Sequence, residues 1–354
     1  MTFRLRHRHL VARGSAIGPP LRVLTIYFDG TAPHSIAAAI TYTDGLAFPP
    51  ETGCGLLGWW CVIRGMAIML VNPGVAGLSE VVGVVREWQY DAAPMQLHPG
   101  DLGWFWQRGA EAIAAAIRTW SREGQILAVG LLDGPELLRL TTAPDAQRDE
   151  ELAQQLVEDV TEPERGVLPA GKVAVEAPVG ALIMDLLSAD GWRTDEPWTP
   201  LRRDLTEPVE DTGLRIEVIG PEQAPAHTAV HRSSFGSPKF TDKRWHAMAA
   251  GLPYADARSL VAYDDQGNAV AAVTAWSAGP GKPGVLEPMG VHADHRGHGY
   301  GKAITIAAAA ALRELGSSRA IVCAESSNVG AVATYESADF QQLPARRDRY
   351  RDDA

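Results

Sequence analysis

The chain has 354 residues, 46% of them hydrophobic and 21% charged, so it is too apolar for an intrinsically disordered protein and long enough for about two domains. Its net charge of −11 disfavours nucleic acid and anionic membranes as partners. Three cysteines are too few for a disulfide framework, and we therefore expect a reducing, cytoplasmic environment.

The beginning of the chain differs from the rest in charge, because the first 70 residues carry six arginines and only three acidic residues. The apolar run 53–71 has nearly the length of a membrane span, but Arg64 and four glycines interrupt it. We therefore expect no membrane span, and interpret residues 1–72 as an N-terminal extension of low order. A translation start near Met66 or Met69 is the alternative explanation.

The following region is predicted to alternate helices and strands. Helices are indicated by apolar residues that recur on one side of an Ala-rich or polar segment, and strands by short apolar runs between turn signals. The expected helices are 75–88, 109–122, 149–160 and 180–189. The expected strands are 125–132, 136–142, 172–176 and 199–205. A polar, Pro-containing segment, 206–213, is then interpreted as a linker.

The second half begins a new series of elements and ends in a basic tail. Its expected strands are 214–219, 259–263, 269–277, 285–291 and 319–324. Its expected helices are 221–235, 242–250, 301–315 and 329–337. This alternation predicts an α+β (α/β) fold in which a mixed, mostly antiparallel sheet is flanked by helices.

Two short matches at one offset indicate an internal repeat. At a spacing of 149 residues, Ser188-Ala189-Asp190 matches Ser337-Ala338-Asp339, and segment 143–145 falls on segment 292–294. Both matches lie at corresponding places in the order of predicted elements, which favours a tandem duplication. We expect a first domain over 73–207 and a second over 213–354.

A glycine-rich segment between a predicted strand and a predicted helix is the clearest chemical signal. Residues 285–306 read VLEPMGVHADHRGHGYGKAITI. Gly297, Gly299 and Gly301 leave the backbone uncrowded, so several N–H groups can face one anion at the start of a helix. Arg296 adds a permanent positive charge. The segment predicts a pyrophosphate-binding loop, with a plain turn into a helix as the alternative.

The spacing excludes two other phosphate-binding motifs. A Walker loop needs glycine at position 296 and Ser or Thr at position 303, where the chain has Arg296 and Ala303. A dinucleotide fingerprint needs a different third glycine spacing and follows the first strand of its domain, whereas at least three strands are predicted before this loop.

The glycine loop and the residues after it resemble the GCN5-related N-acetyltransferase (GNAT) family. Segment 296–301 fits the family's R/Q-x-x-G-x-G/A loop, and Asn328, Tyr335 and Phe340 are similar to its Asn…Tyr-Glu-x-x-Gly-Phe ending. Asp339 stands where the family has glycine. The resemblance covers residues 214–340, and 75–205 only as a degraded copy. The layout resembles tandem acetyltransferases of the mycothiol synthase type.

The resemblance implies acetyl-CoA as co-substrate. Backbone groups of Met289 and Val291 would pair with the pantetheine arm, and Asn328 would assist it. The loop that would hold the pyrophosphate consists of Arg296, Gly297, His298, Gly299, Tyr300, Gly301 and Lys302.

Two residues are the candidate catalytic groups. The resemblance gives Tyr335 the role of protonating the departing thiolate, and a packing role on a short helix is the alternative. An attacking ammonium must lose a proton, and Glu287 is placed where the family often has a carboxylate, although a solvent-facing strand residue is an equal interpretation. His231 and His246 are further candidates for the base. His292, His295 and His298 lack a Cys or carboxylate cluster, so we expect no metal.

The first copy has lost the predicted loop. At the offset of 149 residues, the positions of Arg296, Gly297, Gly299 and Gly301 hold Gln147, Arg148, Glu150 and Leu152. Leu186 takes the position of Tyr335. We therefore expect one CoA-binding domain, with the first domain serving as scaffold and part of the acceptor cleft, where Trp104, Phe105 and Trp106 form either a pocket wall or a plain core cluster.

The expected reaction is acetyl transfer to a primary amine by direct attack in a ternary complex. The acceptor would be a small molecule such as an amino sugar, antibiotic, amino acid or polyamine, and the protein a monomer or homodimer. A protein or peptide acceptor, or a non-catalytic acyl-CoA-sensing module, are the alternatives.

Overall fold

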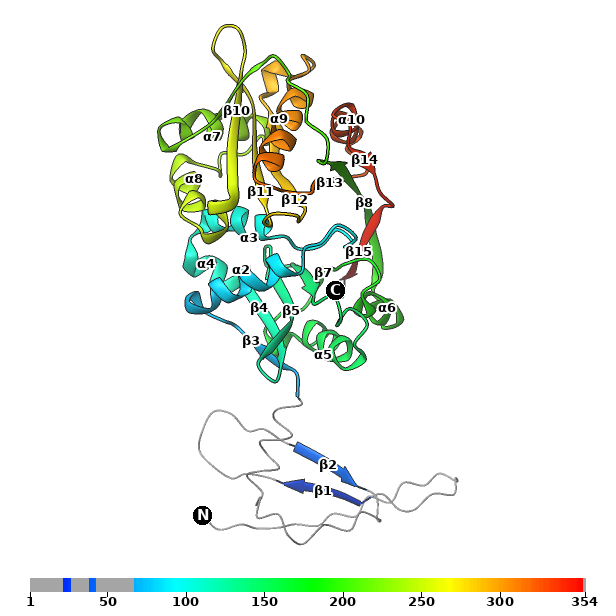
Figure 1. Ribbon diagram of the computed structural model, residues 1–354. Helices are drawn as coiled ribbons and strands as arrows, with labels where there is room; N and C mark the ends of the chain where they lie inside the picture. The colour runs from blue at the N-terminus through cyan, green and yellow to red at the C-terminus, as the bar shows by residue number, and fades with distance from the viewer. Residues whose placement is uncertain (1–21, 27–37, 43–66, 353–354) are drawn as a thin grey trace. The chain divides into compact units, whose positions relative to one another are not determined.

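A computed structural model describes residues 22–26, 38–42 and 67–352 of the chain (Figure 1). The chain divides into two units, 1–62 and 63–354. In the first unit, β1 (Arg22–Ile26) pairs antiparallel with β2 (Ala38–Tyr42). The rest of the proposed extension up to residue 66, with most of the apolar run, lies outside the described residues. In the described part of the chain, no helix is long and apolar enough to cross a membrane.

The second unit contains both predicted halves. In the first half the helices are α2 (Leu78–Glu87), α3 (Pro99–Phe105), α4 (Ala110–Ala116), α5 (Glu150–Thr161) and α6 (Leu182–Ala189). The strands of this half are β3 (Met69–Val71), β4 (Ile117–Arg122), β5 (Gln125–Leu132), β6 (Leu137–Thr142), β7 (Lys172–Glu176) and β8 (Arg193–Asp204).

The second half has the same kind of element order. Its helices are α7 (Ala224–Phe235), α8 (Asp242–Ala249), α9 (Tyr300–Glu314) and α10 (Val329–Ser337). Its strands are β9 (Arg215–Val218), β10 (Ala257–Tyr263), β11 (Ala269–Ser277), β12 (Gly284–Val291), β13 (Arg319–Glu325), β14 (Gln341–Gln342) and β15 (Arg346–Asp352).

One expected helix is wrong in its second half. The segment 109–122 forms α4 only as far as Ala116, and β4 follows at once and pairs with β5. The tight connection through Glu123 and Gly124, both with positive φ, turns the chain back. Ile113, Ile117 and Trp120 share one side of an ideal helix, but cross-strand pairing overrides that pattern.

The strands of both halves join in a single sheet. Along it the order is β3-β4-β5-β6-β7-β15-β8-β13-β12-β11-β10-β9, and β14 also pairs with β8. Within this order only β6–β7 and β12–β13 pair in parallel, which confirms a mixed, mostly antiparallel sheet.

The two halves exchange their last strands. The strand β8 follows β7 in sequence but pairs with β13 of the second half, while β15 follows β13 and pairs with β7 of the first half. The strands β8 and β15 also pair with each other. The basic tail is therefore a central strand, which the sequence analysis did not predict.

In the second half, helices cover both faces of the sheet. Along β11, Ala271, Val273 and Ala275 pack in one cluster with α9, while Ala272 and Trp276 pack in another with α7 and α8 (Figure 1). This alternation follows from side chains that point to opposite faces of a strand.

Helix α3 of the first half packs directly on β11 and β12 of the second half. A Cβ atom on Gly103 would lie 2.3 Å from the Trp276 ring, and one on Gly100 would lie 2.5 Å from Val285. The helix begins at a His98 cap whose Nε2 donates to the carbonyl oxygen of Pro283, 3.1 Å away. These contacts fix the first half against the strand that leads into the glycine loop.

Candidate active site

The glycine loop lies between β12 and α9, as expected. Gly297 and Gly299 have φ values of 81° and 82°, a region that residues with a Cβ rarely adopt. Gly299 is the N-cap of α9, and no side chain caps the helix there. The first N–H groups of α9 therefore have no partner within the helix, which is the arrangement that binds an anion.

The start of α9 is also held close to its neighbours. A Cβ atom on Gly301 would lie 2.9 Å from Thr334 Cγ2 of α10 and 3.4 Å from Val291 Cγ2 of β12. A larger residue would push the helix N-terminus away from β12. The glycines therefore shape a cradle with exposed N–H groups that fits a pyrophosphate.

The strands β12 and β13 separate next to this cradle. Their parallel pairing is limited to Gly284 with Ala320 and Val285 with Ile321. Farther along, β12 continues to pair with β11 only, up to Val291 with Ala271. A strand edge is thus left open over the second half of β12.

The open edge presents the backbone groups of Met289 and Val291. The N–H of His292 donates to the carbonyl oxygen of Val270, so this pair is hydrogen-bonded. Because successive residues of a strand point their backbone groups to opposite sides, those of Val291 and Met289 point away from β11 and toward the gap. An extended pantetheine arm could pair with them as an additional strand.

The basic residues of the loop lie at its rim. Arg296 is exposed and donates from its guanidinium to the carbonyl oxygen of Ser234, at the end of α7, over 2.6 Å. Lys302 is also exposed. The His298 ring stacks on Tyr300, with 5.9 Å between ring centroids, and Tyr300 packs against the core of the second half.

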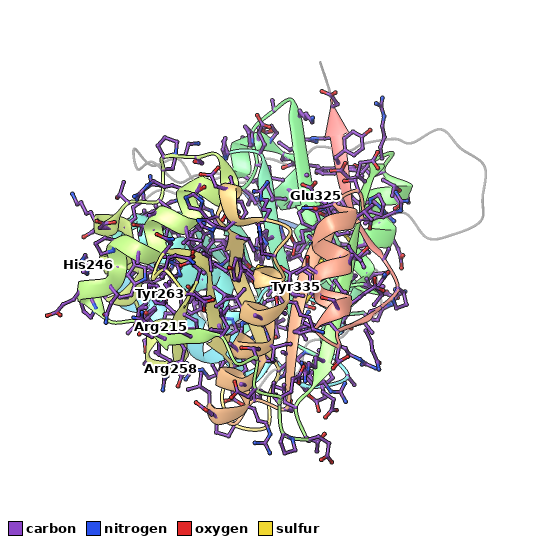
Figure 2. The ribbon with its side chains drawn as sticks, turned by 90° about the horizontal axis from the view of Figure 1, so that it is seen from above. Arg215, His246, Arg258, Tyr263, Glu325 and Tyr335 are labelled. Carbon is purple, nitrogen blue, oxygen red and sulfur yellow. The ribbon has the colours of Figure 1, made fainter. Side chains whose placement is uncertain are left out.

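Tyr335 lies on α10, where this helix packs beside α9 (Figure 2). It is 6% exposed, and its hydroxyl makes no hydrogen bond with the described residues. Burial raises the pKa of this phenol, and the nearby groups Glu287 and Cys323 raise it further. The phenol is therefore neutral at physiological pH and can act as a proton donor.

Asn328 is the N-cap of α10, so one of its two side-chain polar atoms already has a partner. Its Oδ1 accepts from the backbone N–H of Ala331 at 3.1 Å. The proposed role of Asn328 toward the pantetheine arm stays a prediction.

Glu287 is half-buried in β12 and faces the first half of the chain. Burial and the Asp101 carboxylate raise the pKa of Glu287 well above its ordinary value, although Arg139 acts in the opposite direction. The Glu287 side chain is hydrogen-bonded to that of Asp101. The solvent-facing interpretation of Glu287 is therefore wrong.

A buried charge network continues from this pair to the exchanged strands. Arg139 binds Asp101 at 2.9 Å and Glu176 at 3.0 Å. Glu176 in turn binds Arg346 of β15 at 3.1 Å. The network joins α3, β6, β7 and β15, so charges from both halves meet next to Tyr335 and Glu287.

The two histidine candidates for the base differ in their surroundings. His231 packs among Trp104, Phe235 and Phe240, and burial lowers its pKa to about 4. His246 is exposed on α8, well away from Tyr335 (Figure 2). Among the residues that the structure describes, no three His, Cys, Asp or Glu side chains group as a metal site requires.

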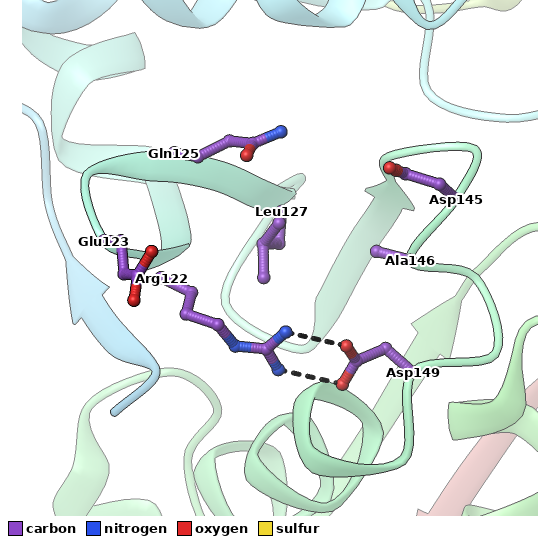
Figure 3. Close-up of a pocket in the computed structure, with 7 residues that line it drawn as sticks. All are labelled: Arg122, Glu123, Gln125, Leu127, Asp145, Ala146 and Asp149. Atoms are coloured by element: carbon purple, nitrogen blue, oxygen red, sulfur yellow. Dashed lines mark hydrogen bonds and ion pairs between the residues drawn. The ribbon is translucent and has the colours of Figure 1, made fainter. Parts of the chain in front are cut away.

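The first half has a pocket at the corresponding helix start, but a carboxylate occupies the anion position. Asp149 caps α5 by accepting from the N–H of Leu152 at 2.8 Å, and Arg122 donates to both Asp149 oxygens at 2.9 and 3.0 Å (Figure 3). The pocket has a volume of about 310 Å³ and is lined by Arg122, Glu123, Gln125, Leu127, Asp145, Ala146 and Asp149.

Comparison with known proteins agrees with this geometry. Residues 226–340 match the acetyltransferase (GNAT) family, a segment that runs from α7 through the cradle to the end of α10. The segment 226–340 is therefore similar to GNAT acetyltransferases. A comparison with curated proteins finds no match.

Solved structures show the same fold over most of the chain. A GNAT-family acetyltransferase from Colwellia psychrerythraea is 16% identical with a TM-score of 0.52, and covers 81% of this chain and 100% of its own. A GCN5-related N-acetyltransferase from Sphaerobacter thermophilus is 19% identical with a TM-score of 0.50, and covers 80% of this chain and 95% of its own. The expected GNAT fold is confirmed.

Two features of the candidate site were missed from the sequence. Helix α3 had a signal in His98-Pro99 followed by Asp101, since a proline at the first helical position and an acid at the third are typical of a helix start. The contact of Asp101 with Glu287 had none, because it depends on how the two halves pack. Phe105 and Trp106 are buried, which confirms the core interpretation for these two residues.

Proposed function

We propose that this protein is an acetyl-CoA-dependent N-acetyltransferase that acts on the primary amine of a small molecule. The observation that carries the proposal is the open edge of β12, which presents Met289 and Val291 and leads to the uncapped start of α9. An acyl donor with an extended arm and a pyrophosphate matches these two features together. The loop residues predicted from the sequence, with Arg296 and Lys302 at the rim, would hold the phosphates.

Tyr335 and Glu287 supply the proton transfers of the proposed reaction. The acceptor enters as an ammonium, because an alkylamine with a pKa of about 10.4 is almost fully protonated at neutral pH. Glu287, in its ionised form, takes one proton, and the nitrogen lone pair then attacks the thioester carbonyl carbon. As the C–N bond forms, the C–S bond breaks and Tyr335 donates its proton to the departing thiolate.

The protons balance over one turnover. The nitrogen loses two protons on the way from ammonium to amide. One replaces the proton that Tyr335 gave to the CoA thiol, and the other leaves through Glu287 to solvent. Direct attack in a ternary complex therefore needs no covalent enzyme intermediate.

The charges next to Glu287 favour a cationic acceptor. Asp101 and Glu287 contribute two carboxyl groups at one point, and Arg139 is already paired with Asp101 and Glu176. An amino sugar, an aminated antibiotic, an amino acid or a polyamine carries the positive charge that this site attracts. A protein or peptide amine is the second candidate, because the same carboxylates would attract a lysine.

We assign the two halves different roles. Residues 73–207 form the domain that has lost donor binding, and residues 213–354 form the catalytic domain, apart from the exchanged strands β8 and β15. The protein would act in the cytoplasm as a monomer or homodimer.

Thiol release from acetyl-CoA tests the proposal. Purified protein is incubated with acetyl-CoA and a panel of amino sugars, aminoglycosides, amino acids, polyamines and peptides, and free CoA thiol is followed with time. Release that depends on a small amine supports the proposal, and release with peptides alone favours the second candidate. If CoA binds but no acceptor stimulates release, the protein is an acyl-CoA-sensing module and the proposal fails.

A further inference from the structure

The first half places one carboxylate against the proposed base of the second half. Helix α3 packs on β11 and β12 through Gly100 and Gly103, where a Cβ atom would meet Trp276 or Val285 at under 3 Å. This close approach puts Asp101, one of the two residues between those glycines, beside Glu287. The two side chains are joined by a hydrogen bond.

Asp101 is the member of this pair that stays ionised. It is 3% exposed, and it accepts from Arg139 Nη2 at 2.9 Å and from the backbone N–H of His98 at 2.6 Å. Burial disfavours its charge, but Arg139 and these hydrogen bonds hold the pKa of Asp101 below its ordinary value. Two ionised carboxylates cannot share a hydrogen bond, so Glu287 must carry the proton and donate it to Asp101.

We infer that Asp101 is a positioning residue of the transfer reaction. Its carboxylate keeps a proton on Glu287 until the cationic acceptor arrives, and Glu287 then releases that proton to solvent. This inference rests on the proposed function, in which Glu287 takes a proton from the acceptor. The resting pair carries one negative charge, which attracts an ammonium. Once the ammonium lies beside the pair, its positive charge favours the second ionisation, and Glu287 becomes a base only when a substrate is present.

The groups that act on Glu287 come from several elements packed against it. Two are acidic and raise its pKa, and one is basic and lowers it; the phenol of α10 lies nearby and is itself affected by Glu287. These groups are Asp101 of α3, Asp133 after β5, Arg139 of β6 and Tyr335 of α10.

The pH profile of D101N tests the inference. Asparagine removes the negative charge that disfavours ionised Glu287 and leaves Arg139, which favours it. We expect the pH at which kcat/KM rises to fall by about one unit or more, with CoA affinity unchanged. E287Q should lose this rise and most of kcat.

A control at the same domain junction separates this effect from a structural one. Asp256 binds Arg86 across the halves at 2.5 Å, but is not among the groups that act on Glu287. D256N should therefore leave the pH profile in place even if it lowers the melting temperature. An unchanged profile in D101N, or the same shift in D256N, would overturn the inference.

A second variant and a second measurement cover the remaining outcomes. If D101N does not fold, R139Q is used, and its profile should move to higher pH, because it removes the positive charge that favours ionised Glu287. The Glu287 carboxyl is also titrated by NMR of protein labelled with carbon-13 at glutamate side chains, with E287Q to assign the signal. This titration needs no turnover, so a raised value in the wild type that falls in D101N supports the coupling even if no acceptor is found, whereas an ordinary value overturns it.

Discussion

Asp149 and Gly299 are the N-caps of the corresponding helices α5 and α9, and only Asp149 fills that place with a side chain. Its carboxylate accepts from the N–H of Leu152 and binds Arg122, so the first half carries its own anion where the second half leaves N–H groups for a ligand. We propose that this replacement of a ligand by a side chain accounts for the expected loss of donor binding in the first half.

This difference predicts one CoA site per chain. Isothermal titration with CoA should give a stoichiometry of one. G299D should weaken binding roughly tenfold or more, because it places a carboxylate next to the pyrophosphate, where like charges are costly. A measured stoichiometry of two would refute the assignment of the halves.

G171D provides the matched control for backbone strain. Gly171 also has a positive φ, with open space around its Cβ position, but lies in the first half. The G171D variant should be less stable than the wild type and should keep the wild-type affinity for CoA. Equal losses of affinity in both variants would show that general destabilisation, not charge in the cradle, explains the result.

Y335F should slow transfer without weakening donor binding. The phenol is the proposed source of the thiolate's proton, and general acids of this kind contribute at least about 100-fold to the rate. We expect kcat to fall by that factor, with the Kd for CoA unchanged, in thiol-release and titration assays. Tyr254 is half-buried and donates to Ser259 Oγ at 3.0 Å, so Y254F should alter stability and spare kcat.

Arg346 should be essential to the stability of both halves. It is 6% exposed and binds Glu176 of the first half and Asp348 of its own strand. R346M removes the cation of Asp348 and one of the two cations of Glu176, which costs about 3–5 kcal/mol in the free energy of unfolding. Urea unfolding measures the loss. R347M, on the exposed side of the same strand, should change stability little, and a comparable loss there would contradict the role given to the buried network.

Asp348 should make the protein less stable as pH rises from about 4 to 6. Burial raises the pKa of this carboxyl from 3.8 to about 6, although Arg346 acts against the rise. Between these values the folded state binds more protons than the unfolded state, so stability falls with increasing pH. The stability of the wild type relative to D348N should decrease by up to about 3 kcal/mol from pH 4 to pH 7. Urea unfolding at several pH values checks this. If the stability difference between wild type and D348N does not change with pH, the pKa of Asp348 is not raised in the folded protein.

Much of the second half could be predicted from residues 285–340. The glycines, the apolar strand before them and the Ala-rich helix after them have local causes, since positive φ values and helix formation depend on neighbouring residues. Tyr335 could be placed on its helix for the same reason. Helix α4 was extended too far because Ile117 and Trp120 fit a helical spacing as well as a strand, and pairing with β5 decided between them.

The sequence by itself predicted the repeat, the glycine loop at Gly297–Gly301 and the absence of its glycines from 147–152, because these features follow from residue types at fixed spacing. Only the tertiary structure decided that β8 and β15 exchange halves, since strand partners depend on packing between distant segments. The same packing brings Asp101 against Glu287. Two carboxyl groups far apart in sequence share one proton there because the fold removes water from both and leaves Arg139 to neutralise only one of them.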